Sequence, residues 1–131
     1  MSFDLFVNGG LMRGMALHGN LDGAEFLSED RTAPRYRLYS IDDFHPGMFE
    51  VEEGGVSVAG EIYRVPEPVW LRVEAGEPPG LYCGTVRLAS GRDIYGILYP
   101  RELAEASHKD ISEYGDWRGY LDSLDRGAPR R

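Results

Sequence analysis

Short apolar runs follow one another along this chain, and a cluster of glycine, proline, asparagine or aspartate ends almost every one of them. Runs of this length are typical of strands, and Gly-Gly or Ser-Gly between two of them is typical of a hairpin. The pattern predicts about six or seven strands and two to four short helices. Strands that follow one another in hairpins favour a curled, mostly antiparallel sheet or small barrel, so we expect an α+β fold with short flanking helices.

The first strand and two hairpins are the clearest expected elements. Phe3–Val7 is an apolar run that two glycines stop at Asn8–Gly10, which indicates a central strand entering a tight loop. Each hairpin is indicated by two strand-like runs joined through glycine. The hairpins are expected over Met48–Val51 with Val56–Val65, across Gly54-Gly55, and over Leu81–Leu88 with Ile94–Leu98, across Ser90-Gly91.

The remaining segments give weaker signals. Ala24–Leu27 and Arg35–Ser40 resemble two parts of one strand, and Met12–Leu21 has room for a helical turn that Gly14 and Gly19 weaken. Proline is permitted at an early helical position, which favours a short helix after Pro66 and Pro68. The expected helices cover Val69–Ala75, Arg101–Ala106 and a segment that opens at Ser112 and runs through Trp117, Tyr120, Leu121 and Leu124.

Size and charge limit the class of protein. A chain of 131 residues suits one domain, expected over residues 1–125, with a frayed tail over 126–131. The net charge is −8, from 22 acidic and 14 basic residues, which disfavours nucleic acid as a partner. The N-terminus lacks the features of a signal peptide, and no apolar run approaches the roughly 20 residues of a membrane span. We therefore expect a soluble protein that binds neither nucleic acid nor membrane.

Cysteine and histidine usage bears on cofactors and location. Cys83 is the single cysteine, so no internal disulfide forms, which agrees with a cytoplasmic location. Its strand-like surroundings predict a small buried apolar side chain. The three histidines, His18, His45 and His108, are far apart and have no metal-ligand spacing. The sequence therefore predicts no metal and no cofactor.

Several short motifs, in their order along the chain, resemble the gamma-glutamylcyclotransferase-like superfamily. They are the loop after the first strand, Tyr36-Arg37-Leu38-Tyr39, Pro46-Gly47, Gly60-Glu61-Ile62-Tyr63, and an acidic loop with Glu77 or Glu74 before Tyr82. A narrower resemblance is to the C-terminal domain of allophanate hydrolases. It rests on Arg31–Tyr39, on Gly84-Thr85-Val86 and above all on Asp110–Leu121, which contains Gly115-Asp116-Trp117-Arg118-Gly119-Tyr120.

The resemblance implies a site for a small carboxylate-bearing amide or carbamate. Cyclotransferase chemistry frees a 5-oxoproline ring from a gamma-glutamyl amide, and one carboxyl group with a raised pKa can move the proton in both steps. Glu77, in a Pro-Pro-Gly loop, is the first choice for this catalytic group and Glu74 the second. Glu61 alternates along a strand and is expected to face water. The substrate-binding residues implied are Asn8, Gly9, Gly10, Leu11, Arg13, His18, Tyr63 and Tyr82.

Two alternatives remain open. The allophanate hydrolase resemblance implies a lyase step on an N-carboxylated substrate, which requires a cationic clamp and a histidine or protonated acid. Candidates for these are Arg13, Arg37 or Arg64 with His18 or His45. Asn8 and Gly10 replace the loop tyrosine and hydroxyl residue of the cyclotransferases, which favours a non-catalytic module that binds a small carboxylate or docks onto an amidase encoded elsewhere. A separate amidase and a second copy of the chain are the expected macromolecular partners.

Overall fold

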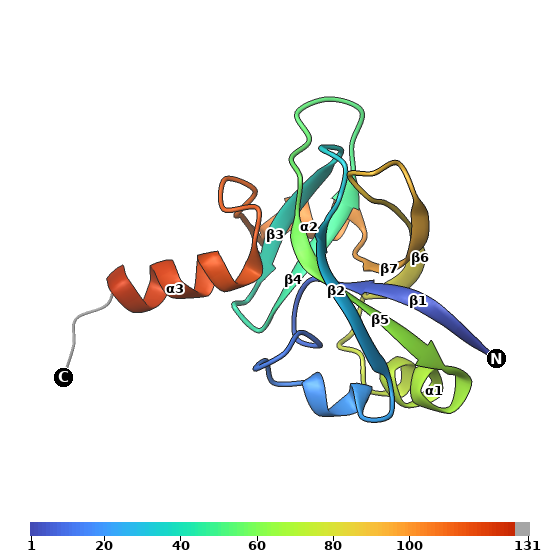
Figure 1. Cartoon of the computed structure of the whole chain (residues 1–131). Helices are drawn as coiled ribbons and strands as arrows, with labels where there is room; N and C mark the ends of the chain where they lie inside the picture. The colour runs from blue at the N-terminus through green and yellow to red at the C-terminus, as the bar shows by residue number, and fades with distance from the viewer. Residues whose placement is uncertain (128–131) are drawn as a thin grey trace.

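Two sheets form the body of the molecule (Figure 1). Residues 1–127 are described by the structure, which is a computed structural model. The five-stranded sheet has the order β2-β5-β1-β7-β6, and the three-stranded sheet has the order β4-β3-β8. The strands are β1 Ser2–Val7, β2 Glu25–Arg31, β3 Tyr36–Ile41, β4 His45–Glu50, β5 Ala59–Pro66, β6 Tyr82–Arg87, β7 Asp93–Leu98 and β8 Lys109–Asp110. The helices are the 3-10 turn η1 His18–Leu21, α1 Glu67–Ala75, α2 Arg101–Ser107 and α3 Trp117–Gly127.

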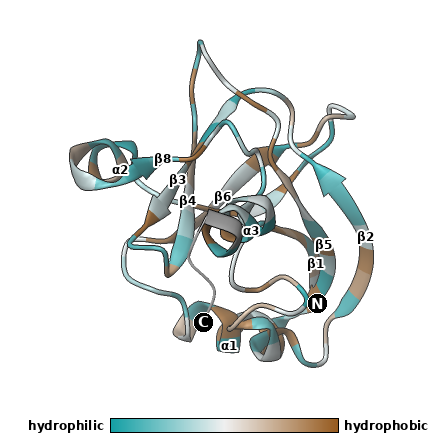
Figure 2. Cartoon of the chain, turned by 90° about the vertical axis from the view of Figure 1, so that its left-hand side faces the viewer, coloured by the Kyte–Doolittle hydropathy of each residue, from teal (hydrophilic) through white to brown (hydrophobic). Residues whose placement is uncertain are grey.

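The predicted α+β class and the mostly antiparallel sheet are confirmed. β1 is the central strand of the larger sheet and pairs antiparallel with β5 and parallel with β7. Its residues Leu5, Phe6 and Val7 are buried, because both neighbouring strands and the covering elements exclude water from them. Much of the edge strand β2 is coloured hydrophilic in Figure 2, in keeping with its largely exposed residues.

One predicted hairpin forms and the other does not. β6 and β7 pair antiparallel from Tyr82 with Leu98 to Arg87 with Asp93, as expected. The hairpin predicted across Gly54-Gly55 is wrong, because β4 pairs with β3 and β5 lies in the other sheet. The turn between β3 and β4 is made by Asp42 and Asp43, with φ of 55° and 60°. Aspartate tolerates this left-handed conformation better than most residues, so a turn without glycine is possible here.

Other expectations for local structure need correction. Ala24–Leu27 and Arg35–Ser40 do not belong to one strand, since β2 and β3 lie in different sheets. Of Met12–Leu21, only η1 is helical. The last helix begins at Trp117 rather than Ser112, because the Ser112 hydroxyl accepts a hydrogen bond from the Leu38 N–H at 2.8 Å instead of capping a helix. Cys83 is exposed on the edge strand β6 and not buried.

The last helix joins the body through its first turns. Trp117 and Tyr120 are buried in the main core, as expected for residues that dock this helix, while α3 projects away from the sheets in Figure 1. Of the tail predicted over 126–131, residues 126 and 127 continue α3. Residues 128–131 lie outside the described part of the chain.

Candidate functional site

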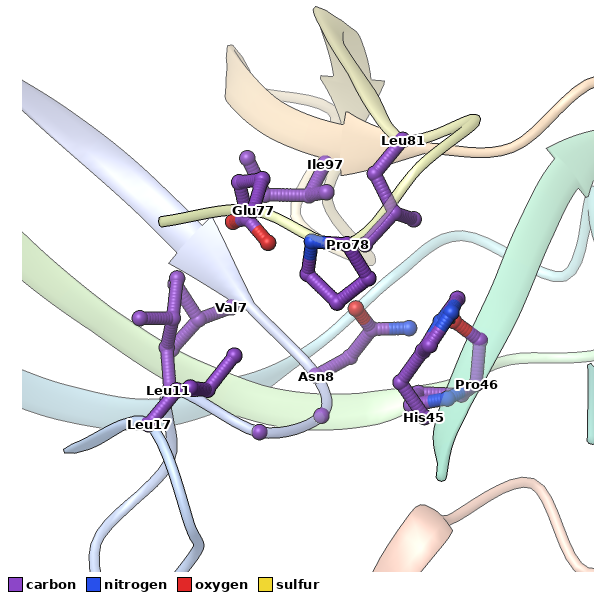
Figure 3. Close-up of a pocket in the computed structure, with 12 residues that line it drawn as sticks. Val7, Asn8, Leu11, Leu17, His45, Pro46, Glu77, Pro78, Leu81 and Ile97 are labelled. Atoms are coloured by element: carbon purple, nitrogen blue, oxygen red, sulfur yellow. The ribbon is translucent and has the colours of Figure 1, made fainter. Parts of the chain in front are cut away.

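A pocket lies where the end of β1, the start of β4 and the loop between α1 and β6 meet (Figure 3). Its cavity volume is about 30 Å³, which suits a small polar group better than a large ligand. Most of the wall is apolar, and Asn8, His45 and Glu77 are its polar side chains. The lining residues are Val7, Asn8, Gly9, Gly10, Leu11, Leu17, His45, Pro46, Glu77, Pro78, Leu81 and Ile97.

The loop after β1 lines this pocket with Gly9, Gly10 and Leu11. A Cβ atom at Gly9 would lie 2.5 Å from the Cδ atom of Pro46, so only glycine allows this close approach. Hydrogen bonds from the N–H groups of Met12 and Leu17 to the carbonyls of Gly9 and Gly10 hold the loop in shape. Within residues 1–127, no hydrogen bond engages the N–H groups of Gly9, Gly10 or Leu11. A carboxylate or developing oxyanion can therefore accept hydrogen bonds from this loop.

Glu77 faces this loop from the other side of the pocket (Figure 3). It follows the C-terminus of α1, where the N–H of Gly76 donates to the Arg72 carbonyl at 3.1 Å. Pro78 and Pro79 restrict the chain beyond it, since proline fixes φ. Gly80, with φ of 92°, lets the loop approach the ring of Tyr99, because a Cβ there would lie 2.7 Å from Tyr99 Cε1. The backbone on both sides of Glu77 is thus fixed.

One oxygen of the Glu77 carboxyl group is buried without a partner in the described part of the chain, while the side chain as a whole is partly buried. Its Oε1 atom is inaccessible to water and has no hydrogen-bond partner among the described residues. Burial disfavours the ionised form and raises the pKa of Glu77 to about 7. A carboxyl group with this pKa donates and accepts protons with similar ease near neutral pH. Glu77 therefore has the property that proton transfer in the pocket requires.

His45, a candidate only for the alternative lyase step and not for the main substrate-binding set, is a polar residue of the pocket. Its exposed fraction is 8%, and its Nδ1 lies 3.0 Å from the carbonyl oxygen of Pro46. Its ring meets Tyr99 edge to face, with ring centroids 6.0 Å apart. The signal that points to it is its position directly before Pro46-Gly47, one of the motifs of the family resemblance. His45 and Pro46 line the pocket because β4 begins at His45.

Two of the predicted residues lie outside the pocket lining and are exposed. Glu74 is on the water-facing side of α1 and is absent from the pocket wall. Tyr82 is 49% exposed, and the preceding Leu81 lines the pocket instead. Of the two predicted glutamates, the structure thus brings only Glu77 together with the Asn8–Leu11 loop.

Arg13, His18 and Tyr63 gather in a different groove, behind the loop. His18 Nδ1 lies 2.9 Å from the carbonyl oxygen of Leu11, so it braces the loop without lining the pocket. Arg13 donates from its backbone N–H and from Nε to Glu61, at 3.0 and 3.1 Å. The structure therefore places these residues where they support the loop.

Glu61 was expected to face water, and this expectation is wrong. Its side chain is fully buried and accepts hydrogen bonds from Arg13, from the Tyr63 hydroxyl at 2.9 Å and from Arg118 Nη2 at 3.1 Å. Burial opposes its ionisation, but these hydrogen bonds outweigh the burial and lower the pKa of Glu61. Arg118 also donates to the Arg13 carbonyl, so a residue of α3 is tied to the loop that follows β1.

No group of histidine, cysteine, aspartate and glutamate side chains suited to a metal ion occurs between residues 1 and 127. Over the same residues, no helix has the length and apolar composition needed to cross a membrane.

The fold and the pocket define the class of protein. The architecture matches that of a gamma-glutamyl cyclotransferase structure with a TM-score of 0.52 over 98% of this chain, at 14% identity, so this likeness concerns the fold alone. The sequence model of the allophanate hydrolase C-terminal domain matches residues 3–122. The chain belongs to this family.

Individual relatives agree with this family. A uropathogenic Escherichia coli-specific protein of known crystal structure is 42% identical, with a TM-score of 0.88 over 93% of this chain and 97% of that one. Kluyveromyces lactis allophanate hydrolase is 26% identical, with a TM-score of 0.86 over 95% of this chain and 22% of that one. The urea amidolyase of Lachancea kluyveri is 28% identical over 131 residues, 94% of this chain and 7% of that protein. The chain thus spans 7% of the curated relative that it matches.

Proposed function

We propose that the chain acts on a small amide or carbamate that carries a carboxylate, and that Glu77 moves the proton in this reaction. The observation that supports this most strongly is the Glu77 carboxyl group, whose Oε1 is buried and unpaired within the described residues and which lies opposite a loop whose N–H groups have no partner there. A carboxyl group that only stabilised the fold would be expected to have hydrogen-bond partners, because an unpaired buried polar group costs free energy.

The proposed division of labour follows from the two walls of the pocket. The N–H groups of Gly9, Gly10 and Leu11 bind the substrate's carboxylate or stabilise an oxyanion. In a cyclisation, the substrate amine attacks its own amide carbonyl and Glu77 accepts the proton that this nitrogen loses. The amide C–N bond then breaks, and Glu77 returns the proton to the leaving nitrogen. One carboxyl group with a pKa of about 7 serves both steps.

In a lyase step on an N-carboxylated substrate, Glu77 would act only as a proton donor. Protonation of the nitrogen by neutral Glu77 breaks the N–C bond and releases carbon dioxide. The arginine clamp expected for this chemistry is absent from the pocket lining. Arg37 is paired with Asp110 at 2.6 Å, and Arg64 with Asp4 at 3.5 Å. We therefore assign the charge stabilisation in either reaction to Glu77 and the backbone N–H groups.

The test is to compare Glu77→Gln with Glu74→Gln, which makes the same change on the exposed face of α1. Both variants and the unmodified chain are assayed against a panel of gamma-glutamyl amides and N-carboxylated amides. Glu77→Gln keeps the shape of the side chain but cannot titrate, so turnover is expected to fall by about 10²- to 10⁴-fold. Glu74→Gln is expected to keep full turnover. Equal activity in Glu77→Gln and the unmodified chain would refute the assignment.

A second candidate is a non-catalytic module that binds a small carboxylate or docks onto a separate amidase. Support for it comes from the allophanate hydrolase and urea amidolyase relatives, of which this domain is only 22% and 7%. This candidate predicts that small carboxylates bind with equal affinity to the unmodified chain and to Glu77→Gln, and that no compound of the panel turns over.

A further inference from the structure

Two polar atoms of the pocket residues, Glu77 Oε1 and His45 Nε2, have no hydrogen-bond partner among residues 1–127. His45 is more than nine-tenths buried and lines the pocket together with Glu77. Its Nδ1 faces the Pro46 carbonyl oxygen at 3.0 Å. A carbonyl oxygen only accepts hydrogen bonds, so Nδ1 carries the hydrogen and Nε2 is the nitrogen left for a ligand. Within residues 1–127, no hydrogen bond engages Nε2.

The His45 ring is held in place rather than free to swing. Tyr99 packs against it edge to face, and Tyr99 is itself confined by Gly47 and Gly80, whose Cβ positions would lie within 3.0 Å of its ring. Tyr99 also donates its backbone N–H to the Met48 carbonyl at 2.9 Å, which ties it to β4. In the neutral ring, Nε2 is thus a hydrogen-bond acceptor whose position is set by β4 and by Tyr99, the residue that follows β7.

The three walls of the pocket present complementary groups. The Gly9–Leu11 loop offers N–H donors, Glu77 offers a carboxyl group that donates when protonated, and His45 offers an acceptor. Figure 3 shows the Asn8 amide between Glu77 and His45. A ligand that satisfies all three walls carries an anionic group for the loop, a carbonyl oxygen for Glu77 and an N–H for His45.

We propose that His45 selects the ligand by accepting a hydrogen bond at Nε2 from its amide or amine N–H, so that the pocket favours carboxylates with a nearby N–H over carboxylates without one. This inference rests on the proposed function, because it assumes that the pocket is the ligand site. It adds a specificity-determining residue and narrows the substrate class to compounds in which a carboxylate and an N–H donor are close together.

The test uses two small probes that share a carboxylate and differ in the N–H group. Malonamate has a primary amide, and monomethyl malonate has a methyl ester in its place. Calorimetric titration of the full chain is expected to show malonamate binding about tenfold more tightly, because the ester leaves Nε2 without a donor. His45→Phe is expected to reduce this ratio to about one with little change in the affinity for monomethyl malonate. His45→Gln retains an acceptor oxygen and is expected to restore part of the preference.

The outcomes separate this inference from the proposed function. A ratio near one in the unmodified chain, or an unchanged ratio in His45→Phe, would overturn the role of His45 while Glu77 kept its own. Failure of both probes to bind would overturn the pocket as a ligand site, and the inference with it. If His45→Phe does not fold, the ¹⁵N resonance of His45 Nε2 in the unmodified chain decides. It is expected to shift with malonamate and not with monomethyl malonate, and equal shifts would contradict the inference.

Discussion

Glu61 is a fully buried glutamate and Glu77 a partly buried one with a single buried oxygen, and their surroundings give the two carboxyl groups opposite properties. Glu61 is fully buried and receives hydrogen bonds from Arg13, Tyr63 and Arg118, so its pKa is lowered. Glu77 has a buried oxygen with no partner among the described residues, and burial raises its pKa to about 7. Both groups lose water on folding, but only Glu61 is compensated for that loss.

The comparison separates a carboxylate that stabilises the fold from the carboxyl group that we propose moves protons. Glu61 stays ionised because its hydrogen bonds favour the charged form, and it ties α3 and β5 to the loop after β1 through Arg118 and Arg13. Glu77 has no such hydrogen bonds among the described residues, so its ionised form costs stability and its pKa is raised toward neutral pH. Carboxyl groups with a raised pKa are common in active sites, because they transfer protons readily. The number of hydrogen-bond donors around each carboxyl group, rather than its depth, accounts for the difference.

The largest expected effect is on stability, from Glu61→Gln. This change leaves Arg13 and Arg118 without their shared carboxylate, and breaking a buried ion pair by removing one partner typically costs about 3 to 5 kcal/mol. Because both arginines are partly exposed, we expect a loss of about 2 to 3 kcal/mol in the free energy of unfolding at pH 7. Urea denaturation measures it. A loss below about 0.5 kcal/mol would show that the network does not stabilise the fold.

The next effect is a pH-dependent gain in stability from Glu77→Gln. The pKa of Glu77 is raised from 4.5 to about 7 in the folded chain, so the folded state holds a proton that the unfolded state has already lost in this range. Stability is therefore highest below pH 4.5 and falls as the pH rises toward 7. The variant is expected to lack this fall and to be more stable than the unmodified chain at pH 8, by about 2 kcal/mol.

Denaturation curves at several pH values measure this gain, with Glu74→Gln as the control for loss of one surface charge. We expect the control to follow the unmodified chain at every pH. A difference between Glu77→Gln and the unmodified chain that did not change between pH 4 and pH 8 would mean that Glu77 has an ordinary pKa.

A smaller effect is expected from Tyr63→Phe. The change removes only the hydroxyl that donates to Glu61 at 2.9 Å, and a hydrogen bond to a charged group contributes about 1.5 to 3 kcal/mol at most. Since Arg13 and Arg118 still bind Glu61, we expect a loss of about 1 kcal/mol. Tyr95→Phe is the control, because Tyr95 is 52% exposed and its ring contact with Phe3 would persist. Equal losses in both variants would exclude a specific contribution from Glu61.

The sequence predicted those parts of the fold that depend on neighbouring residues. Phe3–Val7 and the β6–β7 hairpin were found because an apolar run or a short glycine turn determines each locally. The hairpin predicted at Gly54-Gly55 was wrong because glycine indicates a change of chain direction but does not determine which strands pair. Asp42 and Asp43 turn the chain in a conformation that glycine more often supplies, so the real hairpin had no glycine signal.

At the site, too, the sequence predicted what neighbouring residues determine and missed what distant residues determine. Glu77 was selected from its rigid loop and the family resemblance, both of which are readable along the chain. The partners of Glu61 lie 48 and 57 positions away, at Arg13 and Arg118, so strand alternation alone suggested a water-facing side chain. His45 was predicted only as one of two histidines for the alternative lyase step, because its place in the pocket depends on how β4 meets the β1 loop.

The most direct test of the account is a side-chain carboxyl titration by ¹³C NMR, with the Glu77 resonance identified by its absence from Glu77→Gln. We predict that Glu77 titrates near pH 7 and that Glu61 remains ionised to below the ordinary value of 4.5. The two curves would then lie on opposite sides of pH 4.5. A Glu77 midpoint below pH 5 would contradict the account, because the pocket would then hold an ordinary carboxylate and no proton-transfer group.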